Sequence, residues 1–189
     1  MAFIVVYDAN VLFAAPLRDL LIRVAQAGVV RARWTSEILD ECFRSVLAQR
    51  PDLNEERLNR TRELMNRAIR DVLVTGYEPL VQGLLLPDPD DRHVLAAAVR
   101  AGAQTIVTFN LKDFPSSQLG PLGIEAKHPD DFILEAIHLA PGAVSAAITE
   151  QARALSNPPQ SLDHLLDTLS ALGLSQSVSK LRELFGMDV

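Results

Sequence analysis

Near its start the chain reads Phe3-Ile4-Val5-Val6-Tyr7, which runs directly into Asp8-Ala9-Asn10-Val11-Leu12. The first five residues are apolar, mostly β-branched and of strand length, without polar alternation, a pattern typical of a parallel strand covered on both faces. Asp8 is therefore predicted at the carboxyl end of a buried strand, the edge where ligands bind in open α/β sheets. Alternatively, Asp8 simply begins a turn or caps the next helix.

Strand and helix patterns alternate along the rest of residues 1–138. Strands are predicted at 29–34, at 72–80 with an interruption near Gly76, at 104–108, and more weakly around Ile124. Helices are predicted at 17–27, at 36–50, from Asp52 or Asn54 to about Val72, at 88–101 and at 129–138. This alternation predicts a doubly wound α/β fold with a mainly parallel central sheet flanked by helices.

The pattern changes at Pro141, after which three short helices are predicted at 144–155, 161–172 and 175–185. Their breaks are Asn157-Pro158-Pro159 and Leu172-Gly173. We therefore predict a domain at 1–138 and a small all-helical extension at 141–189. The second helix carries an apolar stripe that must be buried, either on the chain's own α/β domain or on a partner or second copy. The stripe consists of Leu162, Leu165, Leu166, Leu169 and Leu172.

Composition restricts the class of protein. The chain has 189 residues, of which 48% are apolar and 22% charged, enough for one domain and an appendage. Its single cysteine, Cys42, excludes an intrachain disulfide and, with four histidines, a cysteine-rich zinc site. Without a signal sequence or a run of membrane-span length, we expect a soluble, cytoplasmic protein. The net charge of −6 would repel nucleic acid, so an RNA substrate would need a local basic surface or a metal ion.

Acidic residues recur where the predicted topology would bring them together. They lie after two strands, in the 36–50 helix and at the start of the 88–101 helix. Because the carboxyl ends of parallel strands lie at one edge of a sheet, these residues would be close together. Carboxylates gathered in one pocket repel one another unless a cation neutralises them, and oxygen ligands favour Mg²⁺ or Mn²⁺. Each has a simpler explanation: Asp88 as a helix cap before Pro89, Glu37 and Glu41 as a solvated face, and Asn110 as a turn residue.

Several of these segments, in this order, resemble the motifs of the PIN-domain family, and more narrowly its VapC-like toxin branch. The resemblance covers about residues 3–138 and depends on the order and spacing of the motifs. The segments are Asp8-Ala9-Asn10-Val11-Leu12, a helix with Glu41, Asp88-Pro89-Asp90-Asp91 leading into Leu95-Ala96-Ala97-Ala98, Ile106-Val107-Thr108-Phe109-Asn110-Leu111-Lys112-Asp113-Phe114, and His128-Pro129-Asp130-Asp131-Phe132.

This resemblance implies a metal-dependent endoribonuclease in which a metal-activated water attacks the phosphodiester in line. The implied catalytic acids are Asp8, Glu41, Asp91 and Asp113, of which Asp8, Asp91 and Asp113 hold one or two Mg²⁺ or Mn²⁺ ions. Asn10, Thr108 and Asn110 are supporting residues, and Asp90 is the rival of Asp91. Asn110 stands where many members have another Asp.

The same resemblance implies the toxin of a bacterial type II toxin–antitoxin pair. Its partners are then an RNA substrate and a cognate antitoxin, which occludes the acidic pocket and inserts an Arg or Lys into it. The chain could also form a homodimer, and the helical extension could contribute to dimerisation or to antitoxin docking. No membrane partner is expected.

Basic residues are concentrated between Arg44 and Arg70, a segment that contains seven arginines and four acidic residues. We predict that Arg44, Arg60 and Arg67 contact the RNA backbone. The alternative is a solvated helix surface with weak Arg–Glu pairs.

Two other functions are considered. A PIN-fold module that binds RNA or protein without efficient catalysis is the alternative raised by Asn110. An Asp-dependent phosphatase would need a second Asp two residues after Asp8, and Asn10 stands there.

Overall fold

The computed structural model describes residues 3–156 and 159–187. In that part of the chain four strands form one parallel sheet with the order β2-β1-β3-β4, which confirms the predicted parallel α/β fold. Val5 of β1 lies opposite Ala32 of β2 and Thr105 of β3, and Thr105 lies opposite Glu125 of β4. The strands are β1 (Phe3–Tyr7), β2 (Val30–Arg33), β3 (Thr105–Val107) and β4 (Glu125–Lys127).

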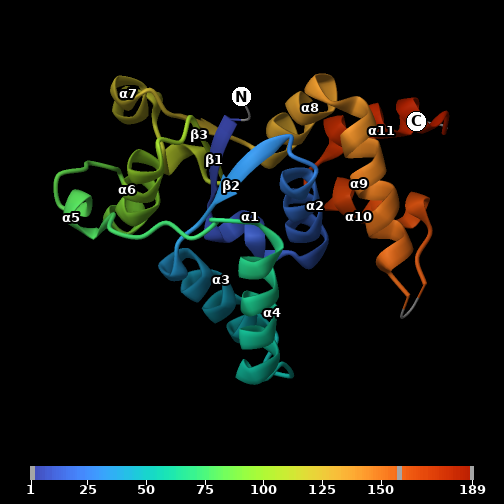
Figure 1. Ribbon diagram of the computed structural model, residues 1–189, viewed down its shortest axis with the longest axis horizontal. Helices are drawn as coiled ribbons and strands as arrows, with labels where there is room; N and C mark the ends of the chain where they lie inside the picture. The colour runs from blue at the N-terminus through green and yellow to red at the C-terminus, as the bar shows by residue number, and fades with distance from the viewer. Residues whose placement is uncertain (1–2, 157–158, 188–189) are drawn as a thin grey trace.

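Helices flank the sheet on both sides. In Figure 1, α5 and α6 lie to the left of the strands, α2, α8 and α9 lie to the right, and α3 and α4 lie below, where β1 leads into α1. The helices are α1 (Ala9–Phe13), α2 (Ala15–Gln26), α3 (Ser36–Gln49), α4 (Glu55–Ala68), α5 (Glu78–Val81), α6 (Arg92–Ala101), α7 (Ser116–Leu119), α8 (Pro129–Leu139), α9 (Pro141–Ala154), α10 (Leu162–Ala171) and α11 (Ser175–Phe185), with 3₁₀ turns η1 (Pro89–Asp91), η2 (Leu111–Asp113) and η3 (Gly120–Leu122).

Local sequence signals set the ends of the helices that carry site residues. Thr35 Oγ1 accepts a hydrogen bond from Ile38 N at 3.0 Å, which fixes the start of α3. Gly102 adopts a left-handed conformation with φ of 63° and ends α6. These two helices bring Glu41 and the residues following Asp91 to the sheet.

The strand predicted at Val72–Leu80 is wrong. The segment makes one isolated parallel bridge, between Trp34 and Leu73, and Trp34 N donates to Val72 O at 3.1 Å. Gly76 has a φ of 72°, so the chain turns there, and α5 begins at Glu78. The preceding helix α4 also ends at Ala68 rather than near Val72, because Ile69 is already extended.

The helical extension packs against its own α/β domain, as one of the two alternatives predicted. Leu165, Leu166 and Leu169 are fully buried in a core cluster that also contains residues of β1, β3 and α2. Leu162 and Leu172 are partly buried against the same cluster. Because this core continues across residues 138–141, the division into domains 1–138 and 141–189 stays a prediction. Asn157 and Pro158 of the predicted break lie outside the described residues.

Among the described residues, no single helix has the length and apolarity of a membrane span. Joined together, α8 and α9 would meet those criteria, but they are bent by 119° relative to each other.

Candidate metal centre and active site

The candidate site lies at the carboxyl edge of the two central strands. Asp8 N donates to Val107 O at 3.1 Å, so the residues that follow β1 and β3 lie side by side. The chain leaves β1 toward β2 and leaves β3 toward β4, in opposite directions. Ligands of open α/β sheets bind at such a switch point.

Asp8 is held rigidly at this point. Its Oδ1 accepts from Ala9 N at 2.7 Å, and its Oδ2 accepts from Thr108 Oγ1 and Asn10 Nδ2, each at 2.8 Å. Only 4% of Asp8 is exposed. Burial raises the pKa of Asp8, the hydrogen bonds from Thr108 and Ala9 lower it, and the charge of Glu41 raises it, with a net increase. The ionised carboxylate is therefore oriented but not neutralised.

Further carboxylates meet Asp8 from other elements. Glu41 in the middle of α3 and Asp91 at the end of η1 line one pocket of about 400 Å³ with Asp8, Asn10 and Arg44. The structure thus brings together residues separated by more than 80 positions in the sequence.

Asp91 also belongs to a second acidic group. Carboxylate oxygens of Asp88, Asp91 and Asp113 all lie within 4.8 Å of one another. Burial, together with the charges of Asp8, Asp88, Asp113 and Glu41, raises the pKa of Asp91 to about 6. Asp91 therefore joins the acids near β1 to those near η2.

His93 is a site residue that the sequence analysis missed. It is 5% exposed, its Nε2 lies 3.0 Å from Glu41 Oε1, and its Nδ1 lies 3.7 Å from Glu37 Oε2. Tyr77 in turn donates to Glu37 Oε2 at 2.8 Å. Burial lowers the pKa of His93, but the hydrogen bond to Glu41 and the charges of Glu37 and Asp8 outweigh it and raise the pKa. A histidine among the apolar residues of a helix, two positions after Asp91, was the available signal.

Asp88 combines the two interpretations weighed for it. Its Oδ1 accepts from Asp90 N at 2.9 Å, which caps η1, and a carboxylate oxygen of Asp88 also lies within 4.8 Å of those of Asp91 and Asp113. Asp90 itself is exposed, so Asp91 is the better placed of the two rivals.

The remaining predicted residues divide between the site and its surroundings. Thr108 and Asn10 bind Asp8, and Asn110 Nδ2 donates to Asp113 Oδ2. Arg60 and Arg67 are exposed on α4, where Arg67 pairs with Glu63 at 3.5 Å. Of the three predicted arginines, Arg44 lines the pocket that contains Asp8.

The chemistry of the donor set fits a hard divalent cation. The ligands offered are carboxylate oxygens, which Mg²⁺ and Mn²⁺ prefer. Burial is the main cause of the raised pKa values of Asp8 and Asp91, and the charges of neighbouring carboxylates raise them further. The carboxylates of Asp88, Asp91 and Asp113 lie close enough together to hold such a cation, and Asp8 and Glu41 line the pocket beside Asp91.

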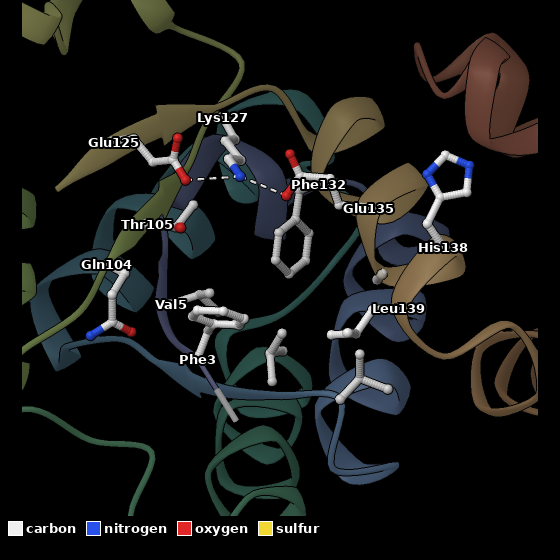
Figure 2. Close-up of a pocket in the computed structure, with 13 residues that line it drawn as sticks. Phe3, Val5, Gln104, Thr105, Glu125, Lys127, Phe132, Glu135, His138 and Leu139 are labelled. Carbon is white, nitrogen blue, oxygen red and sulfur yellow. Dashed lines mark hydrogen bonds and ion pairs between the residues drawn. The ribbon is translucent and has the colours of Figure 1, made fainter. Parts of the chain in front are cut away.

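A separate apolar pocket of about 470 Å³ lies over the amino-terminal ends of β1, β2 and β3. Figure 2 shows Phe3, Phe132 and Leu139 around it, with Lys127 bridging Glu125 and Glu135 at 2.8 and 2.5 Å. Because Lys127 is already paired twice, this pocket presents no free charge from that residue, and it is distinct from the acidic edge.

Comparison with known proteins identifies the family of the chain. The PIN domain family matches residues 4–112, more than half of the chain. The chain belongs to the PIN domain family. A second family, described as the VapC50 C-terminal domain, matches residues 129–183. This PIN domain chain is therefore VapC-like and carries a C-terminal extension of the same type.

The chain is also similar to a protein whose name is that of a ribonuclease. Over 95 residues the chain is 47% identical to a Mycobacterium tuberculosis protein named "Putative ribonuclease VapC50". The matched segment covers 50% of this chain and 56% of that relative, so the chain spans little more than half of the relative's length in the comparison. No solved structure matches the chain significantly.

Proposed function

We propose that this chain is a Mg²⁺- or Mn²⁺-dependent endoribonuclease that hydrolyses RNA phosphodiester bonds. The observation that carries the proposal is the meeting of Asp8, Glu41, Asp88, Asp91 and Asp113 at one sheet edge, where Asp91 has a pKa raised to about 6. The name of the Mycobacterium tuberculosis relative supports the same activity. Groups that repel one another in a pocket are stabilised by a bound cation.

In this proposal Asp8, Asp91 and Asp113 hold the cation, and Asp88 joins them. When bound, a divalent cation activates water and neutralises charge on the reacting phosphate. Thr108 and Asn10 orient the Asp8 carboxylate through hydrogen bonds of 2.8 Å. The proposal also assigns Glu41, whose Oε1 lies 3.0 Å from His93 Nε2, the role of accepting a proton from the attacking water.

Contact with the RNA backbone is assigned first to Arg44, which lines the acidic pocket. Arg60 and Arg67 lie farther along the same basic segment on α4 and extend the path of the strand. A local positive surface beside the acids reduces the repulsion between RNA and a chain of net charge −6.

By its VapC-like family, the chain is proposed to be the toxin of a type II toxin–antitoxin pair that acts on RNA in the bacterial cytoplasm. A cognate antitoxin would inhibit it by placing an Arg or Lys among the carboxylates, where the positive charge replaces the cation. A homodimer is compatible with this function, and the buried stripe of α10 is not needed to form it.

Asn110 favours a second candidate, a PIN-fold module that binds RNA or protein without efficient catalysis. Its amide donates to Asp113 Oδ2, so it occupies one carboxylate oxygen that a cation could use. In that case the protein binds Mn²⁺ and RNA but produces no fragments.

The experiment is incubation of a mixed RNA pool, including tRNA, with purified antitoxin-free protein and Mn²⁺ or Mg²⁺. Discrete fragments that disappear in an Asp8→Asn variant and with EDTA support the nuclease. Fragments that persist in both controls come from a contaminant and contradict the assignment. RNA and metal binding without fragments identifies the binding module.

A further inference from the structure

The turn between α10 and α11 touches the loop that carries Asn110 and Asp113. Gly173 in this turn has a φ of 97°. A Cβ at Gly173 would lie 3.7 Å from Phe109 Cε1 and 3.8 Å from His128 Cε1. The rings of Phe109 and His128 also contact each other edge to face, with centroids 5.1 Å apart. Phe109, which is 37% exposed, thus lies against His128 and next to the turn of the C-terminal extension.

The other side of the same loop is tied to the acidic edge. Phe109 N donates to Asn10 Oδ1 at 3.1 Å, and Asn110 N donates to Thr108 Oγ1 at 3.0 Å. Asn110 then binds the carboxylate of Asp113. A shift of the Phe109 backbone would therefore move Asn110 and change the position of Asp113 relative to Asp88 and Asp91.

The segment that follows the turn is anchored to α8 through Asp130. Asp130, which is 4% exposed, accepts from Ser177 N at 2.8 Å and from Gln176 N at 3.0 Å, which caps the start of α11. Ser177 Oγ donates back to Asp130 O at 2.7 Å. Asp130 lies two residues after His128, so this anchor is next to the ring that contacts Gly173.

We propose that the C-terminal extension positions the metal-binding loop, with Gly173 and Phe109 as the contact through which the extension acts. This inference rests on the proposed function of Asp113 as a metal ligand. It gives the extension a role in the nuclease centre of the same chain, in addition to any role toward an antitoxin.

The test is Gly173→Ala with Gly186→Ala as its matched control. Both glycines have positive φ, 97° and 64°, but a Cβ at Gly186 meets nothing within 4 Å among the described residues. Gly173→Ala strains the turn because of the φ of 97°, and it adds a methyl group against the rings of Phe109 and His128, so the turn has to shift relative to Phe109. In metal-free protein we expect amide hydrogen exchange in residues 108–113 to become about tenfold faster in Gly173→Ala, as local opening becomes easier. It should not change in Gly186→Ala.

Mn²⁺ titration adds a functional measurement. We expect Gly173→Ala to weaken Mn²⁺ binding roughly tenfold, the usual cost of disturbing residues that orient metal ligands. The proposal is overturned if exchange accelerates in residues 172–176 while exchange in 108–113 and the Mn²⁺ affinity stay within about twofold of the unmodified protein, a change too small to indicate coupling.

If Gly173→Ala does not fold, a second pair of variants tests the proposal. Ser177→Ala removes the hydroxyl bond to Asp130, whereas Ser161→Ala removes a cap bond to His164 N within the extension. Faster exchange at 108–113 in Ser177→Ala alone supports the proposal, and equal exchange in both overturns it. Because hydrogen exchange is measured without metal or RNA, an unmodified protein that fails to cleave RNA would contradict the proposed function and leave this test intact.

Discussion

Asp8 and Asp130 are two aspartates with the same exposed fraction, 4% each, but Asp8 lies deeper in the protein and their pKa values shift in opposite directions. Both accept several hydrogen bonds, and burial acts to raise the pKa of both. At Asp130 the hydrogen bonds from Ser177 and Gln176 prevail, and the pKa is lowered. At Asp8 burial and the charge of Glu41 prevail over the hydrogen bonds, and the pKa is raised.

Under the proposed function, this difference separates a structural carboxylate, Asp130, from a metal-binding one, Asp8. Asp130 sits at the positive amino end of α11, where backbone N–H groups satisfy its charge. Asp8 faces Glu41 and Asp91, so its negative charge adds to theirs. A fold that keeps repelling carboxylates together is destabilised by them, and a cation at that place offsets the repulsion.

The largest expected effect contrasts these two aspartates in catalysis. Asp8→Asn should lower the rate of RNA cleavage roughly 100- to 1000-fold, because several kcal/mol of charge stabilisation at the metal are lost. Asp130→Asn should keep the rate within about tenfold, since Asp130 acts on the loop indirectly. Cleavage rates at saturating Mn²⁺ measure both, and equal losses in the two variants would remove the distinction.

Stability should show the reverse order. Asp130→Asn weakens a buried charge-assisted cap and should lower the free energy of unfolding by about 1–3 kcal/mol. Because the pKa of Asp130 is lowered by folding, its contribution is present above the unfolded-state pKa and is lost as the pH falls through the lower folded-state value. Urea unfolding at pH 7 and at acidic pH tests this, and an unchanged midpoint in Asp130→Asn would contradict it.

Asp91 should behave oppositely to Asp130. Its pKa of about 6 exceeds the unfolded value near 4, so metal-free protein loses stability as the pH rises from about 4 through 6. Asp91→Asn should therefore raise the thermal midpoint of metal-free protein at pH 7 by roughly 2–4 °C. The same variant should lose stabilisation by Mn²⁺, and in the unmodified protein Mn²⁺ affinity should fall below pH 6 as protons compete. Thermal scans with EDTA and with Mn²⁺ distinguish these effects.

His93→Gln should give an intermediate effect. The glutamine amide keeps a hydrogen-bond donor near Glu41, but it lacks the titratable ring whose protonated form is favoured by the raised pKa of His93. We expect kcat about tenfold lower, with KM little changed, as for residues that orient catalytic groups. Tyr77→Phe, which removes the bond to Glu37 one step farther away, is the control and should change kcat less. A larger loss in the control would argue against His93 as the residue that orients Glu41.

The smallest effect concerns RNA binding. Arg44→Ala should weaken RNA affinity and reduce the slope of log affinity against log salt by about 1, the value for one lost phosphate contact. Arg67→Ala should reduce the affinity and the slope by a smaller amount, since Arg67 does not line the acidic pocket and already pairs with Glu63. Salt titrations of binding in EDTA, where cleavage is absent, measure the slopes; equal slopes for both variants would place the RNA elsewhere.

Much of this arrangement could be predicted from sequence because it depends on local patterns and on strand direction. The apolar run before Asp8 predicted β1, and parallel strands predicted one shared edge. The strand at Val72–Leu80 was wrong because Gly76 turns the chain, a backbone effect that outweighed the β-branched residues.

Other features depended on contacts between distant segments. Nothing in the local sequence placed His93 beside Glu41, 52 positions earlier. The close approach of Gly173 to Phe109 likewise depends on how the extension packs. The apolar stripe predicted that the extension is buried but not which of its residues would lie next to Phe109.

The most direct test of the central claim is a Mn²⁺ titration of isotopically labelled protein, followed by paramagnetic broadening of its backbone amide signals. We predict that signals of residues 8–10, 88–91 and 110–113 broaden first, and that Asp8→Asn and Asp91→Asn weaken this effect while Asp130→Asn does not abolish it. Broadening centred on another surface, or none at millimolar Mn²⁺ in folded protein, would contradict the assignment of the acidic edge as a metal centre.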